Sequence, residues 1–201
     1  MPSSQNLKKI VVIGPESTGK SSICEGLAAH FHARWVPEYA REYLLRHGMD
    51  YRYEDLLTIA KGQLALEDEA VTAATAQEES LIFIDTDMYV MKVWGEFVFG
   101  RCDSWILDRI NERRYDAYLL PRTDLPWVRD ELREYPDLLS REKLFHIYRD
   151  ILINQSVPWS EVGGQGQQRL DAAISAVNRL LLATGTRGES ADGANPRTTP
   201  R

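Results

Sequence analysis

Gly14-Pro15-Glu16-Ser17-Thr18-Gly19-Lys20-Ser21 is the stretch that decides how the rest of this sequence is interpreted. It matches the pattern G-x-x-x-x-G-K-[ST] at every fixed position. Residues 7–13 before it are rich in β-branched side chains, which is typical of a buried strand. Residues 21–31 after it carry apolar side chains at helical spacing. A strand, a glycine-rich turn and a helix in this order predict a phosphate-binding loop, or P-loop.

The groups in this loop are those that bind a nucleoside triphosphate. Glycines let successive backbone N–H groups converge on phosphate oxygens, and the helix that starts near Gly19 adds the positive end of its dipole. We expect Lys20 to bridge the outer phosphates and the Ser21 hydroxyl to ligate Mg²⁺. The sequence therefore predicts ATP and Mg²⁺ as cofactors. The predicted ATP-binding residues are Gly14, Pro15, Glu16, Ser17, Thr18, Gly19, Lys20, Ser21 and Ser22.

The composition is that of one globular domain. The chain has 201 residues, of which 43% are hydrophobic and 27% charged, so it is long enough to bury a full core. Its formal net charge of −6 does not favour general binding to nucleic acid. It has no apolar run long enough to span a bilayer, and residues 1–6 lack the layout of a secretory signal. We expect a cytoplasmic protein with neither a nucleic-acid nor a membrane partner, and leave the oligomeric state open.

Short apolar runs that alternate with helical patterns predict an α/β fold with a central parallel sheet of about five strands and helices on both of its faces. Besides residues 7–13, strands are expected at 34–36, at 81–84 ending in Asp85, at 117–120 and at 157–159. Helices are expected at 53–76, 88–99 and 104–112, from an N-cap at Ser140 through 152, and at 167–182. The acidic run 67–69 is expected to face solvent. The predicted domain spans residues 8–182, between a flexible N-terminus at 1–7 and a disordered tail at 183–201.

Charged side chains follow two of the predicted strands, at the sheet edge where parallel sheets bind ligands. Asp85 could bind the metal through water or accept the proton of an attacking hydroxyl, and a helix cap is the alternative for both Asp85 and Asp87. Glu38 and Arg41 suit a polyol substrate and a transferring phosphoryl group, or form a charge pair at a helix start. Tyr39 is as well suited to packing as to binding.

The segment after the fourth predicted strand has the position and composition of a mobile cover over the phosphates. Arg129, Arg133 and Arg141 on this cover could neutralise charge and exclude water during transfer, or lie as solvated surface residues. Trp127 could stack on a flat base or anchor the core.

Four segments together are more particular than the P-loop alone. They are the P-loop with Pro-Glu-Ser inside it, Pro37-Glu38-Tyr39-Ala40-Arg41-Glu42, Asp85-Thr86-Asp87, and Tyr118-Leu119-Leu120 leading into Asp124-Leu125-Pro126-Trp127. In combination they resemble the nicotinamide riboside (ribosylnicotinamide) kinase domain of the bacterial NadR type, over about residues 8–182.

The resemblance implies transfer of the γ-phosphate of ATP to the 5′-hydroxyl of nicotinamide riboside, which gives nicotinamide mononucleotide for NAD biosynthesis. It also implies a three-layer P-loop NTPase fold, similar to nucleoside and nucleotide kinases, with a helical lid, and it implies roles for residues at the matching positions. Together with the patterns above, it predicts Lys20, Asp85, Glu38 and Arg141 as catalytic residues, with Asp85 ahead of Glu38 as the base, and Ser21 and Asp85 as the residues that serve the metal. The predicted substrate contacts are Glu38, Tyr39 and Arg41, from their position after the second strand, and Asp87, Asp124 and Trp127, from the resemblance.

The sequence also departs from what the resemblance leads us to expect. Pro121-Arg122 stands where a less constrained link is expected, which leaves the geometry of that loop open. Family members often carry an adenylyltransferase domain before the kinase, and some add a DNA-binding domain, but no signature of either precedes the P-loop here. We therefore expect either a stand-alone kinase or an excised kinase domain, without direct regulation of transcription. The alternatives are a kinase for another small nucleoside or metabolite, and an ATPase switch that regulates a partner.

Overall fold

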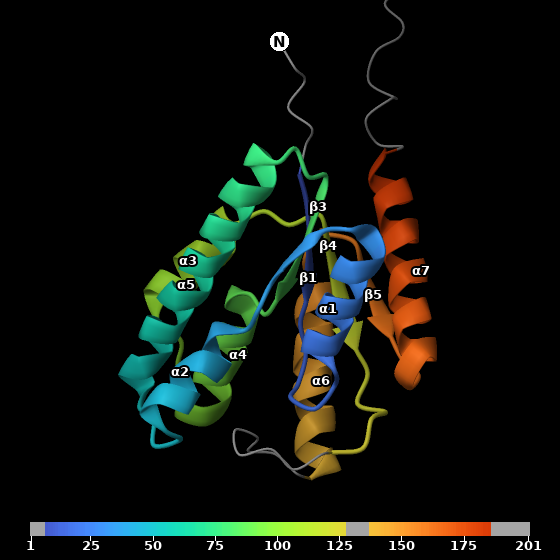
Figure 1. Cartoon of the computed structure of the whole chain (residues 1–201). Coiled ribbons are helices and arrows are strands. Elements are labelled where there is room, and N and C mark those ends of the chain that lie inside the picture. The colour runs from blue at the N-terminus through green and yellow to red at the C-terminus, as the bar shows by residue number, and fades with distance from the viewer. Residues whose placement is uncertain (1–6, 128–136, 186–201) are drawn as a thin grey trace, which may run out of the picture.

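A five-stranded parallel sheet forms the centre of the protein in the computed structural model, which describes residues 7–127 and 137–185 (Figure 1). Its order is β2-β3-β1-β4-β5, so the strand before the P-loop lies in the middle. The neighbouring strands all pair in parallel. This confirms the predicted α/β fold of the P-loop NTPases. The strands are β1 (Lys8–Val12), β2 (Arg34–Val36), β3 (Leu81–Asp85), β4 (Ala117–Pro121) and β5 (Trp159–Val162).

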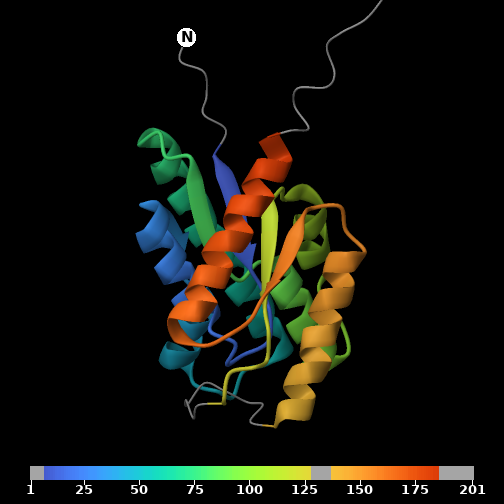
Figure 2. The ribbon, with the colours of Figure 1, turned by 90° about the vertical axis from the view of Figure 1, so that its right-hand side faces the viewer.

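Helices cover both faces of the sheet. One face carries α1 and α7, and Figure 2 shows α7 crossing it. The opposite face carries α3, α4 and α6, with α2 and α5 packed outside them (Figure 1). Among the described residues, no helix is both long and apolar enough to cross a membrane. The helices are α1 (Lys20–Phe31), α2 (Tyr39–His47), α3 (Tyr53–Ala76), α4 (Met88–Phe99), α5 (Ser104–Glu112), α6 (Leu138–Ile153) and α7 (Gly166–Gly185).

The central strands are apolar on both sides because both faces of the sheet are covered. In β1, Ile10 and Val12 pack toward α1 and α7, whereas Val11 packs toward α4 and α6. All five residues of β3 are buried, including Asp85 at its end. The P-loop follows β1 and Asp85 ends β3, so these two neighbouring strands place both at the same edge of the sheet.

Three predicted elements have boundaries that are wrong by two or more residues. The fifth strand is Trp159–Val162 rather than 157–159, because pairing with β4 fixes its register from Trp159 opposite Tyr118. Helix α6 begins before Ser140, which is not its N-cap: the Asp137 carboxylate caps the helix and accepts the Ser140 N–H at 2.7 Å. The last helix also runs to Gly185, beyond the expected end at Leu182.

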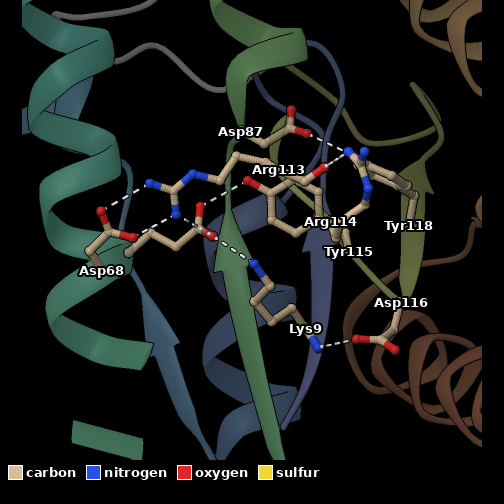
Figure 3. Close-up of polar contacts among 9 residues, drawn as sticks. Lys9, Asp68, Asp87, Arg113, Arg114, Tyr115, Asp116 and Tyr118 are labelled. Atoms are coloured by element: carbon tan, nitrogen blue, oxygen red, sulfur yellow. Dashed lines mark hydrogen bonds and ion pairs between the residues drawn. The ribbon is translucent and has the colours of Figure 1, made fainter. Parts of the chain in front are cut away.

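The acidic run 67–69 does not face solvent as a whole, because Glu67 is fully buried while Asp68 is exposed. Lys9 Nζ lies 3.3 Å from Glu67 Oε1, and the Tyr115 hydroxyl donates to Oε2 at 2.8 Å. Arg113 pairs with Asp68 at 2.6 Å and lies 3.5 Å from Glu67 (Figure 3). A buried carboxylate is retained here because two cations and a hydroxyl compensate it.

Gly62, in the middle of α3, makes room for the ring of Tyr39. A Cβ at this position would overlap that ring. Alanine favours a helix interior over glycine by about 1 kcal/mol, but overpacking a core costs about 1–3 kcal/mol. We therefore expect Gly62→Ala to lower the free energy of unfolding, measured by urea denaturation. In a Tyr39→Leu background the same change should cost less or stabilise, and equal effects in both backgrounds would contradict the proposed contact.

Candidate active site

The P-loop, residues 14–21, connects β1 to α1 at the lower end of the sheet in Figure 1. Gly19 precedes the first residue of α1 and has a left-handed backbone with φ 79°. It has no side chain to accept the N–H groups at the start of the helix, so these groups are available to an anion. The Thr18 hydroxyl and Lys20 Nζ both donate to the carbonyl of Pro15, at 2.8 and 3.2 Å. These contacts close the turn, whose backbone N–H groups can donate to an anion.

Ser17 Oγ supplies a second sign of an anion site. It is buried and has no hydrogen-bond partner among the described residues. An unpaired buried hydroxyl costs about 1–3 kcal/mol, which a phosphate oxygen in the loop would offset. The loop therefore has the chemistry expected of a triphosphate site.

Asp85 lies directly behind Ser21. The Ser21 hydroxyl donates to Asp85 Oδ2 at 2.6 Å, and Asp85 is fully buried. Burial, with the nearby charge of Glu38, raises the pKa of Asp85 to about 6, although Lys20 and the Ser21 hydrogen bond oppose this. A hydroxyl and a carboxylate are the hard oxygen donors that Mg²⁺ prefers, so these two residues fit a magnesium ion beside the P-loop.

A cavity of about 460 Å³ extends from the P-loop. This volume is in the range of small-molecule sites. The P-loop forms one part of its wall, α2 contributes Glu38 and Arg41 at its start, and α4 and α6 contribute apolar and aromatic side chains. The lining residues are Gly14, Pro15, Glu16, Ser17, Gly19, Lys20, Ser21, Ser22, Glu38, Ala40, Arg41, Leu44, Met49, Val90, Val93, Trp94, Phe97, Val98, Leu144 and Tyr148.

The structure thus brings together most of the predicted ATP-binding residues with Glu38 and Arg41. Thr18 is the exception in the loop, because its buried hydroxyl closes the turn and does not line the cavity. Asp85 is also absent from the lining, since Ser21 lies in front of it.

Tyr39 and Asp87 are placed differently from the predicted substrate contacts. The Tyr39 N–H donates to Gln63 Oε1 at 2.8 Å, and its ring packs against Gly62. Asp87 is buried and caps α4, where it accepts the N–H of Tyr89 and the hydroxyl of Tyr118, each at 2.9 Å (Figure 3). Burial raises the pKa of Asp87 to about 7. Asp87 is therefore a helix cap, which is the alternative that the sequence left open.

Asp124 and Trp127 also lie away from the cavity lining. Asp124 accepts the N–H of Gly164 at 2.7 Å and pairs with Arg169 at 2.6 Å, so its oxygens are engaged within the protein. The Trp127 indole N–H donates to Glu16 Oε1 at 3.3 Å, which places this side chain against the P-loop.

Of the three arginines predicted on the cover, Arg129 and Arg133 lie outside the described residues. Arg141 belongs to α6 and is 4% exposed, so it is not a solvated side chain on a cover. Its Nη1 donates to the carbonyl of Leu125 at 3.3 Å, and it does not line the cavity.

The apolar part of the cavity lining was not predicted from the sequence. Trp94 on α4 and Tyr148 on α6 line the cavity, although neither is among the residues predicted for the site. The Trp94 indole N–H donates to the Tyr51 hydroxyl at 3.0 Å, which holds the ring in place. Burial, with the nearby charges of Glu38 and Asp87, raises the pKa of Tyr148.

The chain is similar to curated proteins of NAD metabolism. It is 28% identical over 160 residues to the "Trifunctional NAD biosynthesis/regulator protein NadR" of Salmonella typhimurium, and 29% identical to the protein of the same name from Escherichia coli. Each match covers 78% of this chain and 38% of the relative, so the chain spans well under half the length of these proteins.

Solved structures show the same fold. A NadR protein in complex with NR matches with a TM-score of 0.71 and 22% identity, over 87% of this chain and 51% of that chain. A NadR protein in complex with NAD and AMP-PNP matches with a TM-score of 0.67 and 21% identity, over 94% and 52%. Thymidylate kinase from Ehrlichia chaffeensis matches with a TM-score of 0.60 and 12% identity, over 87% and 99%.

A family assignment comes from a match over most of the chain. The AAA domain family matches residues 9–169, which include the P-loop, Asp85 and all five strands of the sheet except Lys8, the first residue of β1. The protein therefore belongs to the AAA domain family of P-loop proteins.

Proposed function

We propose that this protein is an ATP-dependent kinase that phosphorylates the 5′-hydroxyl of nicotinamide riboside to give nicotinamide mononucleotide. One observation carries the proposal: a single cavity joins the P-loop to an apolar wall that contains Trp94, Phe97 and Tyr148. Such a cavity suits a triphosphate at one part and a flat heterocycle at the other. The similarity to proteins named for NAD biosynthesis, and to a NadR structure in complex with NR, supports nicotinamide riboside as the acceptor.

In the proposed reaction the protein aligns the reactants and neutralises charge, because phosphoryl transfer needs little covalent chemistry from side chains. Lys20 and the N–H groups of the P-loop orient the outer phosphates. Ser21, held by Asp85, is the proposed ligand of Mg²⁺, which when bound neutralises charge on the β- and γ-phosphates. Arg41 lines the same cavity and is suited to the transferring group.

Glu38 is the proposed base. The sequence left Glu38 and Asp85 as alternatives, with Asp85 preferred, but Glu38 lines the cavity and Asp85 is buried behind Ser21. A base must come within hydrogen-bonding reach of the hydroxyl that it deprotonates. Asp85 already accepts the Ser21 hydroxyl, so its proposed role is to orient that ligand of the metal.

The proposal is tested by ADP release from ATP and Mg²⁺ with a panel of acceptors. The panel is nicotinamide riboside, nicotinic acid riboside, uridine, cytidine, adenosine, thymidine monophosphate and no acceptor. We expect little ADP without acceptor and strong stimulation by nicotinamide riboside. Stimulation by a different acceptor alone would mean that the protein is a kinase whose substrate is that acceptor. ATP binding with no stimulation by any acceptor would contradict the proposed kinase activity and favour the ATPase switch. The cytoplasmic location predicted from the sequence needs a separate test.

A further inference from the structure

Arg169, near the start of α7, is a buried cation that touches three separate segments. It is 4% exposed. Its Nη1 donates to Asp124 Oδ1 at 2.6 Å and to the carbonyl of Gly164 at 2.8 Å. Its Nη2 donates to the carbonyls of Thr18 and Arg122, both at 2.8 Å. One guanidinium thus connects the P-loop to the chain after β4 and to the loop between β5 and α7.

The contact with Thr18 acts on the part of the P-loop that binds anions. The carbonyl of Thr18 and the N–H of Gly19 belong to one planar peptide, which is trans because the described chain has no cis bond. In a trans peptide these two groups point in opposite directions. Because Arg169 binds the Thr18 carbonyl, the Gly19 N–H points away from Arg169, and Gly19 is one of the residues that line the cavity.

Gly19 also rests directly against the groups around Arg169. A Cβ on Gly19 would lie 3.2 Å from Leu125 Cδ1 and 3.7 Å from Arg169 Nε. The chain that carries Leu125 is fixed on one side by Asp124, paired with Arg169, and on the other by Arg141 through the Leu125 carbonyl. The back of the P-loop therefore has a rigid support, and the two buried arginines are part of it.

The position of Arg169 is unfavourable for stability alone. A cation near the start of a helix opposes the helix dipole, and a buried charge must recover the cost of its desolvation. Asp124 and three carbonyls compensate the charge, but its Nε is buried with no partner among the described residues. An apolar side chain could fill the same space without these costs, whereas only a planar fork of donors can hold Thr18, Arg122 and Asp124 together.

We infer that Arg169 is a positioning residue for the P-loop: with Asp124 it sets the orientation of the Thr18–Gly19 peptide and so presents the Gly19 N–H to the phosphates of the bound nucleotide. Arg169 is not among the residues that line the cavity, so in this inference it acts on the nucleotide through the P-loop. The inference rests on nucleotide binding at the P-loop, which is part of the proposed function, but it does not depend on the acceptor.

The test compares Arg169→Lys, Arg169→Gln and a matched control, Arg179→Gln, which makes the same change at an exposed arginine of the same helix. Lysine can keep the ion pair with Asp124 but cannot reach the Thr18 and Arg122 carbonyls as well. We expect both Arg169 variants to weaken binding of Mg²⁺–AMP-PNP, measured by calorimetry, about tenfold or more. Arg179→Gln should bind like the wild type.

Steady-state kinetics separate positioning from simple loss of folded protein. Positioning predicts a higher KM for ATP and an unchanged KM for the acceptor in Arg169→Lys, whereas a purely structural role lowers apparent kcat and leaves both KM values unchanged. Wild-type affinity for AMP-PNP in Arg169→Lys would overturn the inference. If that variant does not fold, Asp124→Asn keeps the guanidinium and removes its ionic anchor, and unchanged AMP-PNP binding in that variant would also overturn it. Since AMP-PNP binding needs no acceptor, failure of nicotinamide riboside as the substrate does not alter either outcome.

Discussion

Replacing Lys20 with alanine is expected to lower phosphoryl transfer by about 10²–10³-fold or more while the fold stays intact. Lys20 is the first residue of α1 and lines the cavity, and its Nζ reaches the carbonyl of Pro15 at 3.2 Å. That contact is one that a flexible ammonium can leave for a phosphate oxygen. Without the ammonium, the charge that develops on the transferring group loses a preorganised partner, but little packing is lost.

The measurement is ADP release with saturating acceptor, together with thermal unfolding to show that the variant is folded. Lys61→Ala is the matched control, because Lys61 is exposed on α3 and does not line the cavity. Wild-type turnover in Lys20→Ala would contradict a role for the P-loop in the reaction. Equal losses in both variants would point to a general effect of removing a lysine.

Replacing Glu38 with glutamine is expected to lower kcat by about 10²–10⁴-fold with little effect on nucleotide binding, which is the range for removal of a general base. Glutamine keeps the size of the side chain and its place in the cavity but cannot take the proton of the hydroxyl. Glu42→Gln is the control, because Glu42 lies on the same helix, pairs with Arg46 on the surface and is outside the lining.

Asp85→Asn should produce a different defect. Its proposed role is to hold Ser21 for the metal, so the variant should need more Mg²⁺ to reach half-maximal rate, and added Mg²⁺ should restore part of the activity. If added Mg²⁺ restores Glu38→Gln and has no effect on Asp85→Asn, the two roles are reversed, and Asp85 is the base as the sequence first suggested.

Local patterns were sufficient to predict the fold. The P-loop between a β-branched run and an amphipathic helix identified β1 and α1, and the ranges expected for α3, α4 and α5 match the structure. The predictions failed where distant partners decide the outcome. The start of β5 depends on its register against β4, and the start of α6 depends on the Asp137 side chain rather than Ser140.

Only the part of the site whose position follows from the backbone could be predicted from the sequence. The P-loop and the charged residues after β2 could be placed because parallel strands end at one edge of the sheet. The apolar wall could not, because Trp94 and Tyr148 have the same helical spacing whether they face the core or a cavity. Asp124 was predicted as a substrate contact from the family resemblance, and its pairing with Arg169 could not be predicted because the two residues are 45 positions apart in the sequence.

The most direct test of the proposed function is to follow the phosphoryl group itself. The protein is incubated with Mg²⁺, nicotinamide riboside and ATP that carries ¹⁸O in its γ-phosphoryl group, and the products are identified by mass spectrometry. The proposed reaction predicts nicotinamide mononucleotide that carries the label, formed in equal amount with ADP. ADP accompanied only by labelled inorganic phosphate, with nicotinamide riboside unchanged, would contradict it.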